Sequence, residues 1–243
     1  MLIKKNRIWA VAALLGGVIG LSSCLKQNND VTPPRMNYTA AIINGAYLPS
    51  SLDIFNNNGK MNAVGPYKTG SSAPFQDRPG VHTFSFRKTN GIGLDSVTQQ
   101  FDSTKFYTII TYNDAAKNFV ARYQEESFAG LSNSKVNFRF LNLSPNVGPV
   151  DLYINKKKVA SNQAFSPVAP WNADDPYSGL VEYYITLPGE TTPLVKGTSR
   201  QDASSTQVPF QAGYAYTIYL AGAKDSTGDN KLQLCYLSHT SSL

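Results

Sequence analysis

One loop gathers side chains that could bind a ligand. Its sequence is SPVAPWNADDPYSG, residues 166–179, and it holds Trp171, Asp174, Asp175 and Tyr177 close together. An aromatic ring beside carboxylates can stack on a sugar and accept hydrogen bonds from its hydroxyl groups, and the two acids could hold calcium. In the competing interpretation the rings cover the end of a β domain and the aspartates are solvated turn residues. We favour the structural interpretation and keep these four residues as the candidate ligand loop.

Motifs for catalysis are missing from the rest of the sequence. It contains no H-E-x-x-H, G-x-S-x-G, P-loop or C-x-x-C pattern, and its two histidines, His82 and His239, are far apart in the chain. A hydrolase with paired carboxylates stays open, because two such acids come together only in space. We therefore expect a protein that is not an enzyme and that uses no metal or cofactor.

Cys24 ends a segment with the features of an export signal. Basic residues occupy positions 4, 5 and 7, and the uncharged, mostly apolar run of residues 8–21 suits a secretory signal but is too short for a typical membrane span. The order Leu-Ser-Ser-Cys at 21–24 resembles a bacterial lipobox, in which the cysteine thiol forms a thioether to a diacylglycerol. The resemblance implies a signal peptide over residues 1–23 and a lipid anchor on Cys24.

The residues after Cys24 predict how the protein is attached and where. Residues 24–36 are polar and include two adjacent prolines, which is typical of a tether. Stable anchoring takes more than one acyl chain, and bacterial lipoproteins carry two or three. We expect an outer-membrane location, with the membrane leaflet left open.

Charge and cysteine content limit the possible partners. The chain has 22 basic and 16 acidic residues, and removal of residues 1–23 leaves 19 basic and 16 acidic. This small, dispersed excess does not predict a nucleic-acid surface. If Cys24 carries lipid, Cys235 has no disulfide partner, so the core must be held by packing alone.

Short strands separated by turn residues run through the whole chain after the tether. In VNFRFLNL, for example, Val136, Phe138 and Phe140 point to one face, while Asn137, Arg139 and Leu141 point to the other. Such segments at regular spacing are typical of all-β sandwiches and barrels.

Two halves of the chain correspond in order. SLDIFNNNGK at 51–60 matches PVDLYINKKK at 149–158, which pairs Asp53 with Asp151, and Tyr107 later corresponds to Tyr216. The spacing is the size of a domain and indicates a tandem pair. We predict two β-sandwich repeats, residues 37–130 and 134–243.

The second repeat resembles the domain-of-unknown-function family numbered 4397, which occurs in many secreted and lipid-anchored bacterial proteins. The family pattern is an apolar strand, Asn-x-Ser-Pro, and then Val-Asp-x-Tyr-x-Asn, matched by FRFLNLSPNVGPVDLYIN at 138–155. Lys156 replaces the usual glycine, and the first repeat keeps Asp53 but lacks Ser-Pro. The resemblance implies immunoglobulin-like sandwiches and brings no catalytic residues.

These observations favour a non-enzymatic, lipid-anchored protein that displays a binding or adhesion surface at the cell envelope. Its partners would be the membrane, through the anchor, and a glycan or an envelope protein. The alternatives are a carbohydrate-binding accessory lipoprotein of a glycan-uptake system, which would use Trp171, and a hydrolase with paired carboxylates.

Overall fold

The chain is all-β throughout the part that the computed structural model describes, residues 36–199 and 210–239. Within these ranges there is no α-helix, and a single 3₁₀ turn, η1 (Gly228–Asn230), interrupts the strands. Residues from Met36 onward form one compact unit. The predicted all-β class is confirmed, while the predicted signal peptide and Cys24 lie outside the described residues.

The first repeat consists of two facing sheets. One has the strand order β5-β1-β8-β9 and the other β3-β2-β6-β7, with β4 also paired to β2. The strands are β1 (Tyr38–Asn44), β2 (Ser51–Asn56), β3 (Gly59–Lys60), β4 (Tyr67–Lys68), β5 (Ser72–Asp77), β6 (Gly80–Arg87), β7 (Gly93–Phe101), β8 (Phe106–Asn113) and β9 (Phe119–Glu126). Alternate apolar side chains meet between the sheets, among them Leu52, Phe84 and Ile109.

The second repeat has the same construction. Its sheets have the orders β13-β10-β16-β17 and β12-β11-β14-β15. The strands are β10 (Val136–Asn142), β11 (Val150–Ile154), β12 (Lys157–Gln163), β13 (Asn172–Asp174), β14 (Glu182–Thr186), β15 (Val195–Thr198), β16 (Ala215–Ala221) and β17 (Gln233–His239). Phe138, Leu152 and Ile218 belong to the core between these sheets.

The two repeats match in strand pairing as well as in order. In each, the first strand runs parallel to the last strand but one, so that Ala40 lies opposite Tyr107 and Phe138 lies opposite Tyr216. Both tyrosine hydroxyls accept a hydrogen bond from a backbone N–H five residues earlier, at 2.9 Å for Tyr107 and 3.0 Å for Tyr216. The structure thus carries the duplication that the sequence predicts.

The strand order departs from that of an immunoglobulin domain. There the first strand lies at an edge of its sheet, whereas β1 lies between β5 and β8, and β10 lies between β13 and β16. An interior first strand in a covered sheet is buried along most of its length, and the burial patterns of β1 and β10 agree with this, although β10 carries the polar residues Asn137 and Arg139.

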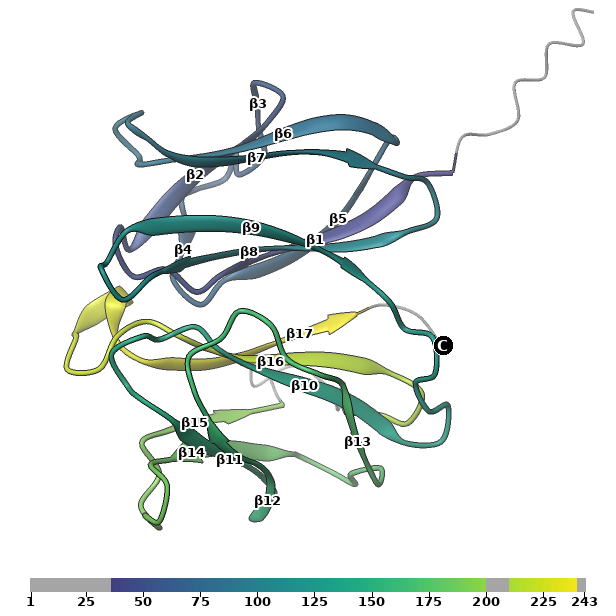
Figure 1. Cartoon of the computed structure of the whole chain (residues 1–243), viewed down its shortest axis with the longest axis vertical. Coiled ribbons are helices and arrows are strands. Elements are labelled where there is room, and N and C mark those ends of the chain that lie inside the picture. The colour runs from purple at the N-terminus through teal and green to yellow at the C-terminus, as the bar shows by residue number, and fades with distance from the viewer. Residues whose placement is uncertain (1–35, 200–209, 240–243) are drawn as a thin grey trace, which may run out of the picture. The chain divides into compact units, whose positions relative to one another are not determined.

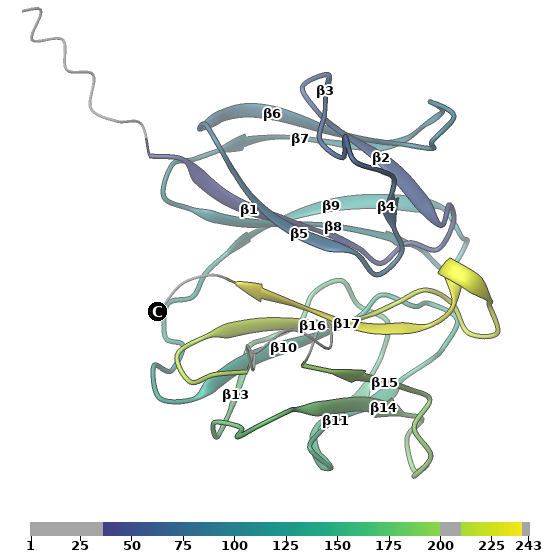
Figure 2. The same ribbon diagram turned by 180° about the vertical axis from the view of Figure 1, so that it is seen from behind.

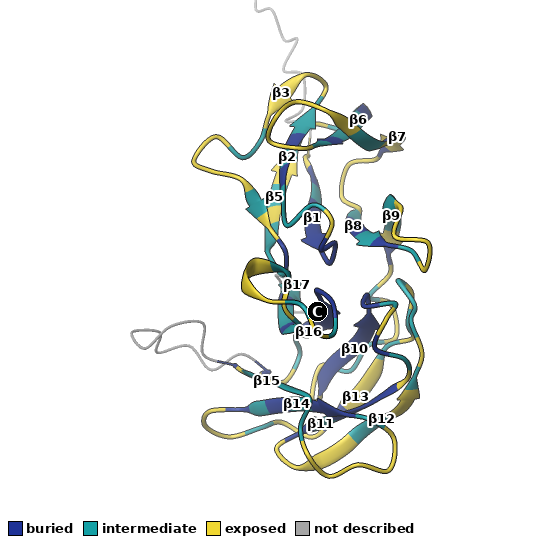
Figure 3. Ribbon diagram, turned by 90° about the vertical axis from the view of Figure 1, so that its left-hand side faces the viewer, coloured by how far each residue is buried: buried dark blue, intermediate teal, exposed yellow. Residues whose placement is uncertain are grey.

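A third core joins the two repeats. The side chains of Ala41 and Ile43 of β1 are outside the first-repeat core and pack with Leu141, Tyr219 and other side chains of the second repeat. Four sheets are therefore stacked, and the two inner ones are covered on both faces (Figure 1 and Figure 2). Figure 3 shows the result for β10, which is buried along its whole length.

Candidate functional site

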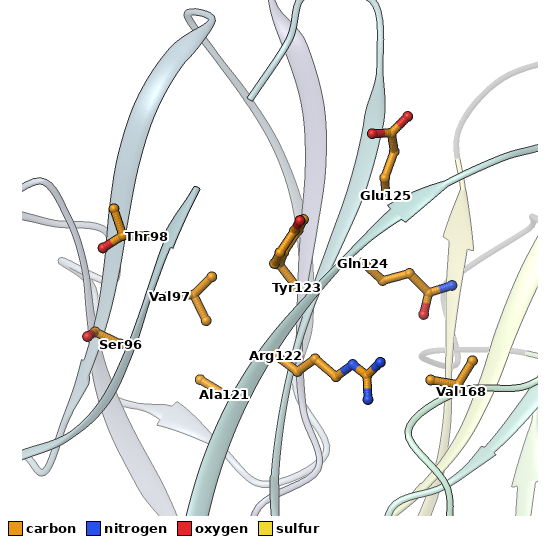
Figure 4. Close-up of a pocket in the computed structure, with 9 residues that line it drawn as sticks. All are labelled: Ser96, Val97, Thr98, Ala121, Arg122, Tyr123, Gln124, Glu125 and Val168. Atoms are coloured by element: carbon orange, nitrogen blue, oxygen red, sulfur yellow. The ribbon is translucent and has the colours of Figure 1, made fainter. Parts of the chain in front are cut away.

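An open groove runs along one side of the first repeat, where the edge strands of its two sheets lie near each other. We call it the edge groove; its volume is about 730 Å³. It is lined by Ser96, Val97 and Thr98 of β7, by Ala121, Arg122, Tyr123, Gln124 and Glu125 of β9, and by Val168 of the second repeat (Figure 4). The lining is mixed, with charged, hydroxyl and small apolar side chains.

Asp95 closes one end of the edge groove. Its Oδ1 accepts the backbone N–H of Ser96 on β7 at 2.8 Å, and its Oδ2 accepts the backbone N–H of Ala121 on β9, also at 2.8 Å. A single carboxylate therefore satisfies one outward amide on each sheet edge. Ser96 and Ala121, whose amides Asp95 accepts, line the groove at this end.

The side chains that face the groove carry opposite charges with different surroundings. Glu125 is paired with Lys105, whose Nζ lies 3.1 Å from its Oε1. Arg122 extends toward Val168, and so does Gln124 (Figure 4). The Oε1 atom of Gln124 is buried and has no hydrogen-bond partner among the described residues. On the side that faces the second repeat, the groove therefore offers the exposed Arg122 cation.

Sequence reasoning missed the edge groove. The segments GLDSVTQQF and FVARYQEE read as strands, but nothing in their residue types shows that they lie at sheet edges on the same side. The only local signal is Asp95 inside a strand, because an acid in a strand interior is unusual and needs a partner.

The structure divides the predicted ligand loop between two environments. Trp171 is partly buried at the boundary between the repeats, where the Arg139 guanidinium carbon lies 4.7 Å from its ring centroid. Phe128 and His239 pack edge-on against the same ring, with centroid distances of 5.8 and 5.6 Å. The indole thus contacts protein groups from both repeats.

The two acids of the predicted ligand loop, unlike its tryptophan, pair with lysines. Asp174 is buried; it pairs with Lys157 and accepts a hydrogen bond from the Tyr177 hydroxyl at 2.5 Å. Asp175 is exposed and lies 3.2 Å from Lys135 Nζ. Burial alone raises the pKa of Asp174, but the bonds from Lys157, Tyr177 and the Asp175 backbone outweigh it and lower the pKa overall. Burial, followed by the hydrogen bond to Asp174 and then by the Asp174 charge, raises the pKa of Tyr177.

A buried ion pair links the repeats beside Trp171. Arg139 of β10 donates to Glu126 of β9 through Nη1 at 2.8 Å and Nη2 at 2.5 Å, and both side chains are almost fully excluded from solvent. The Nε of Arg139 also donates to Thr217 Oγ1 at 2.9 Å. The bond to Thr217 and the Trp171 indole thus complete the surroundings of the Arg139 cation, whose charge Glu126 balances.

His239 completes this cluster from β17. Its Nε2 lies 2.7 Å from Thr217 Oγ1. Burial and, to a lesser extent, the nearby Arg139 charge together lower the pKa of His239 to about 3. The ring is therefore neutral at physiological pH, which suits a position next to a buried guanidinium.

The matched aspartates Asp53 and Asp151 form a repeated ion pair. Asp53 Oδ1 lies 2.8 Å from Lys60 Nζ, and Asp151 Oδ2 lies 2.6 Å from Lys158 Nζ. Asp151 also accepts the backbone N–H of Asn162 at 2.8 Å. The lysine hydrogen bond is the main cause that lowers the pKa of each carboxyl. Both acids tie their strand to the neighbouring hairpin strand.

No group of three or more histidine, cysteine, aspartate or glutamate side chains in the described residues could hold a metal ion. No helix in this part of the chain has the length and apolar character needed to cross a membrane.

The fold defines a class, namely a tandem all-β protein. Each repeat contains two facing sheets, and the strand order of each sheet in the first repeat corresponds to that of its counterpart in the second. A family model with the description "Domain of unknown function (DUF4397)" matches the chain twice, over residues 39–153 and 136–242. The chain belongs to this family, as the pattern at 138–155 predicts. No curated protein matches the chain.

Among solved structures, the chain is similar to a "putative cell adhesion protein" from Bacteroides eggerthii DSM 20697, known from a 1.67 Å crystal structure. The sequences are 10% identical, and the match covers 84% of this chain and 95% of the other, with a TM-score of 0.23. A TM-score this low carries no argument about fold or function.

Proposed function

We propose that this chain is a non-enzymatic binding protein of the bacterial cell envelope, held at the outer membrane by lipid on Cys24, and that it displays the edge groove to a partner. The observation that carries the proposal is the open groove of about 730 Å³ between two edge strands. Exposed edge strands are sites of partner addition unless they are blocked.

The environment of the acidic groups supports a binding role over catalysis. Asp53, Asp151 and Asp174 each pair with a lysine, and Glu126 pairs with Arg139. A hydrolase of the paired-carboxylate type needs two acids that face each other across a substrate. The glycan alternative needs the Trp171 ring to stack on a sugar. That ring already packs against protein groups, namely Arg139, Phe128 and His239.

Each repeat is proposed to be a variant of the immunoglobulin-like sandwich. The hydroxyls of Tyr107 and Tyr216 reach back to the backbone at the start of the last strand but one, which is the arrangement of an immunoglobulin tyrosine corner. The variant would differ by moving the first strand from the edge to the interior of its sheet. Such a rigid support suits the display of a surface.

The anchoring half of the proposal is tested by metabolic labelling with an alkyne palmitate in a bacterium that processes lipoproteins. Wild-type chain should incorporate the label and sediment with membranes, and Cys24→Ala should lose both properties. The chain supplies a matched control, because Cys235→Ala removes its one other cysteine and should label normally. Unchanged labelling and sedimentation of Cys24→Ala would show that the anchor is elsewhere.

The display half is tested by photo-crosslinking on intact cells. A benzoylphenylalanine placed at Thr98, inside the edge groove, should give crosslinked species. The same residue placed at exposed Thr227 of the second repeat is the control and should give few. Equal yields from the two positions would remove the groove as the displayed surface.

A further inference from the structure

The outward amides of β9 identify which chemical groups the edge groove can accept. Neighbouring residues of an antiparallel strand direct their backbone N–H and C=O groups to opposite sides. The N–H of Ala121 bonds to Asp95, so it points away from β8 and into the groove. By the same alternation the N–H and C=O groups of Tyr123 and Glu125 also point outward.

The same reasoning applies to β7 across the groove. The N–H of Ser96 bonds to the other oxygen of Asp95 and therefore points away from β6. By the same alternation, the backbone N–H groups of Thr98 and Gln100 also point away from β6. Asp95 thus supplies to each edge the acceptor that a neighbouring strand would supply, and it does so at one end of the groove only.

We propose that the edge groove binds an extended peptide segment of a partner protein, which adds as a fifth strand beside β9 in the sheet β5-β1-β8-β9. This inference rests on the proposed function and names the partner of the same site. The new strand would bond to the backbone of Tyr123 and Glu125, where Asp95 no longer fills the position. Strand addition of this kind takes affinity from the backbone and specificity from alternate side chains.

The side chains around the groove select the sequence of the added strand. Glu125 is already paired with Lys105, so among the described residues that line the groove the charge offered to the ligand is that of Arg122. Arg122 and Gln124 lie on the face toward Val168, and Ala121 and Tyr123 pack toward the first-repeat core. The matching peptide alternates, with an acidic or polar residue toward Arg122 and small apolar residues on the opposite face.

The corresponding edge strand of the second repeat, β17, has different surroundings in the described residues. Side chains of β17 reach across to the first repeat, where Gln233 donates to the Thr69 carbonyl oxygen at 3.3 Å. Cys235 of β17 belongs to the margin of the core between the repeats.

The test uses the full chain in detergent and fluorescent nine-residue peptides in which threonine and valine alternate. One peptide carries aspartate at its centre on the threonine face, a second carries lysine there, and a third is the aspartate peptide with N-methyl groups along one backbone edge. Fluorescence anisotropy measures each affinity. The aspartate peptide should bind about tenfold more tightly than the lysine peptide, and N-methylation should weaken it at least about tenfold.

Variants of the chain separate backbone pairing from side-chain effects. Glu125→Pro removes one outward N–H without removing a bond to β8 and should weaken the aspartate peptide about tenfold or more. Glu125→Ala keeps that N–H and should bind the aspartate peptide at least about fivefold more tightly than Glu125→Pro does. Arg122→Ala should reduce the preference for aspartate over lysine to less than about threefold.

Three results would overturn the proposal. The first is that the N-methylated peptide binds as tightly as the unmodified aspartate peptide. The second is that no peptide shows saturable binding below about 1 mM. The third is that the chain self-associates in a way that Glu125→Pro abolishes but added peptide does not affect, which would make a second copy of the chain the occupant. Crosslinking from Thr98 tests the display surface whatever the ligand chemistry. If crosslinking succeeds and every peptide fails, the display proposal stands and strand addition is wrong.

Discussion

The ion pair between Glu126 and Arg139 should be a principal link between the repeats, and Glu126→Gln measures its strength. In the wild type two hydrogen bonds of 2.8 and 2.5 Å join the groups, and the two side chains are 1% and 0% exposed. Glutamine keeps one acceptor oxygen but turns an N–H₂ toward the second guanidinium nitrogen. Breaking a buried pair in this way leaves an uncompensated charge and costs about 3–5 kcal/mol, a large part of the about 5–15 kcal/mol that stabilises a typical domain.

The assay is urea unfolding of Met36–Leu243 at 25 °C, followed by far-UV circular dichroism and by tryptophan fluorescence. Trp171 lies over Arg139 and is the single tryptophan in this range, so its emission reports directly on the boundary between the repeats. Glu125→Gln is the matched control. That neighbour is 52% exposed in its surface pair with Lys105 and should cost less than about 1 kcal/mol.

Two outcomes would refute this reasoning. If Glu126→Gln costs no more than Glu125→Gln, the buried pair contributes little to stability. The double variant Glu126→Leu with Arg139→Met removes both charges and should recover most of the loss, because an apolar pair needs no partner. A double variant that is less stable than Glu126→Gln alone would show that the guanidinium acts mainly through Thr217 and Trp171.

Three further predictions follow from local geometry and charge. Lys156 has φ of 68°, in the left-handed region where non-glycine residues are strained, so Lys156→Gly should raise the free energy of unfolding by up to about 1 kcal/mol; Lys156→Ala should change it little, and equal effects of the two would contradict the strain. His239 has a pKa of about 3 in the fold, below the roughly 6.5 of an unfolded chain. Stability is therefore greatest above about pH 6.5 and declines as the pH falls toward 3, by at most about 1.4 kcal/mol per pH unit; urea midpoints for His239→Gln should decline less steeply between pH 7 and pH 4, and identical slopes would exclude this origin. Asp151→Asn should lower the free energy of unfolding by about 1–2 kcal/mol and Asp53→Asn by less, because the two aspartate side chains are 4% and 14% exposed, respectively. Thermal or urea unfolding of the two variants measures these losses, and equal losses would show that burial does not set the difference.

The strands and their repetition could be predicted because both depend on local patterns. Alternation of apolar residues fixes which side chains share a face, and Tyr216, Ile218 and Leu220 do lie together in the second-repeat core. Asparagine is a turn residue that tolerates positive φ, and Asn57 and Asn58 have φ of 47° and 74°. The second repeat places Asn155 and Lys156 at the same positions, with φ of 46° and 68°.

The candidate site could not be predicted in the same way. The sequence brings Trp171 near Asp174 and Asp175, but side chains three or four residues apart in extended backbone need not face one solvent region. The structure turns the indole toward Arg139 and the carboxylates toward Lys157 and Lys135. The edge groove depends on which strands end each sheet, and that property belongs to the assembled topology.

The sequence by itself determined the all-β class, the duplication and family membership, since these follow from residue alternation and from motifs within a few tens of residues. Only the tertiary structure decided what covers the second face of the inner strands. Asn137 and Arg139 alternate with apolar residues as they would on a solvent-facing strand, yet both are buried. The reason is that the partner of Arg139 is Glu126 on another sheet, and no local pattern encodes how two sheets stack.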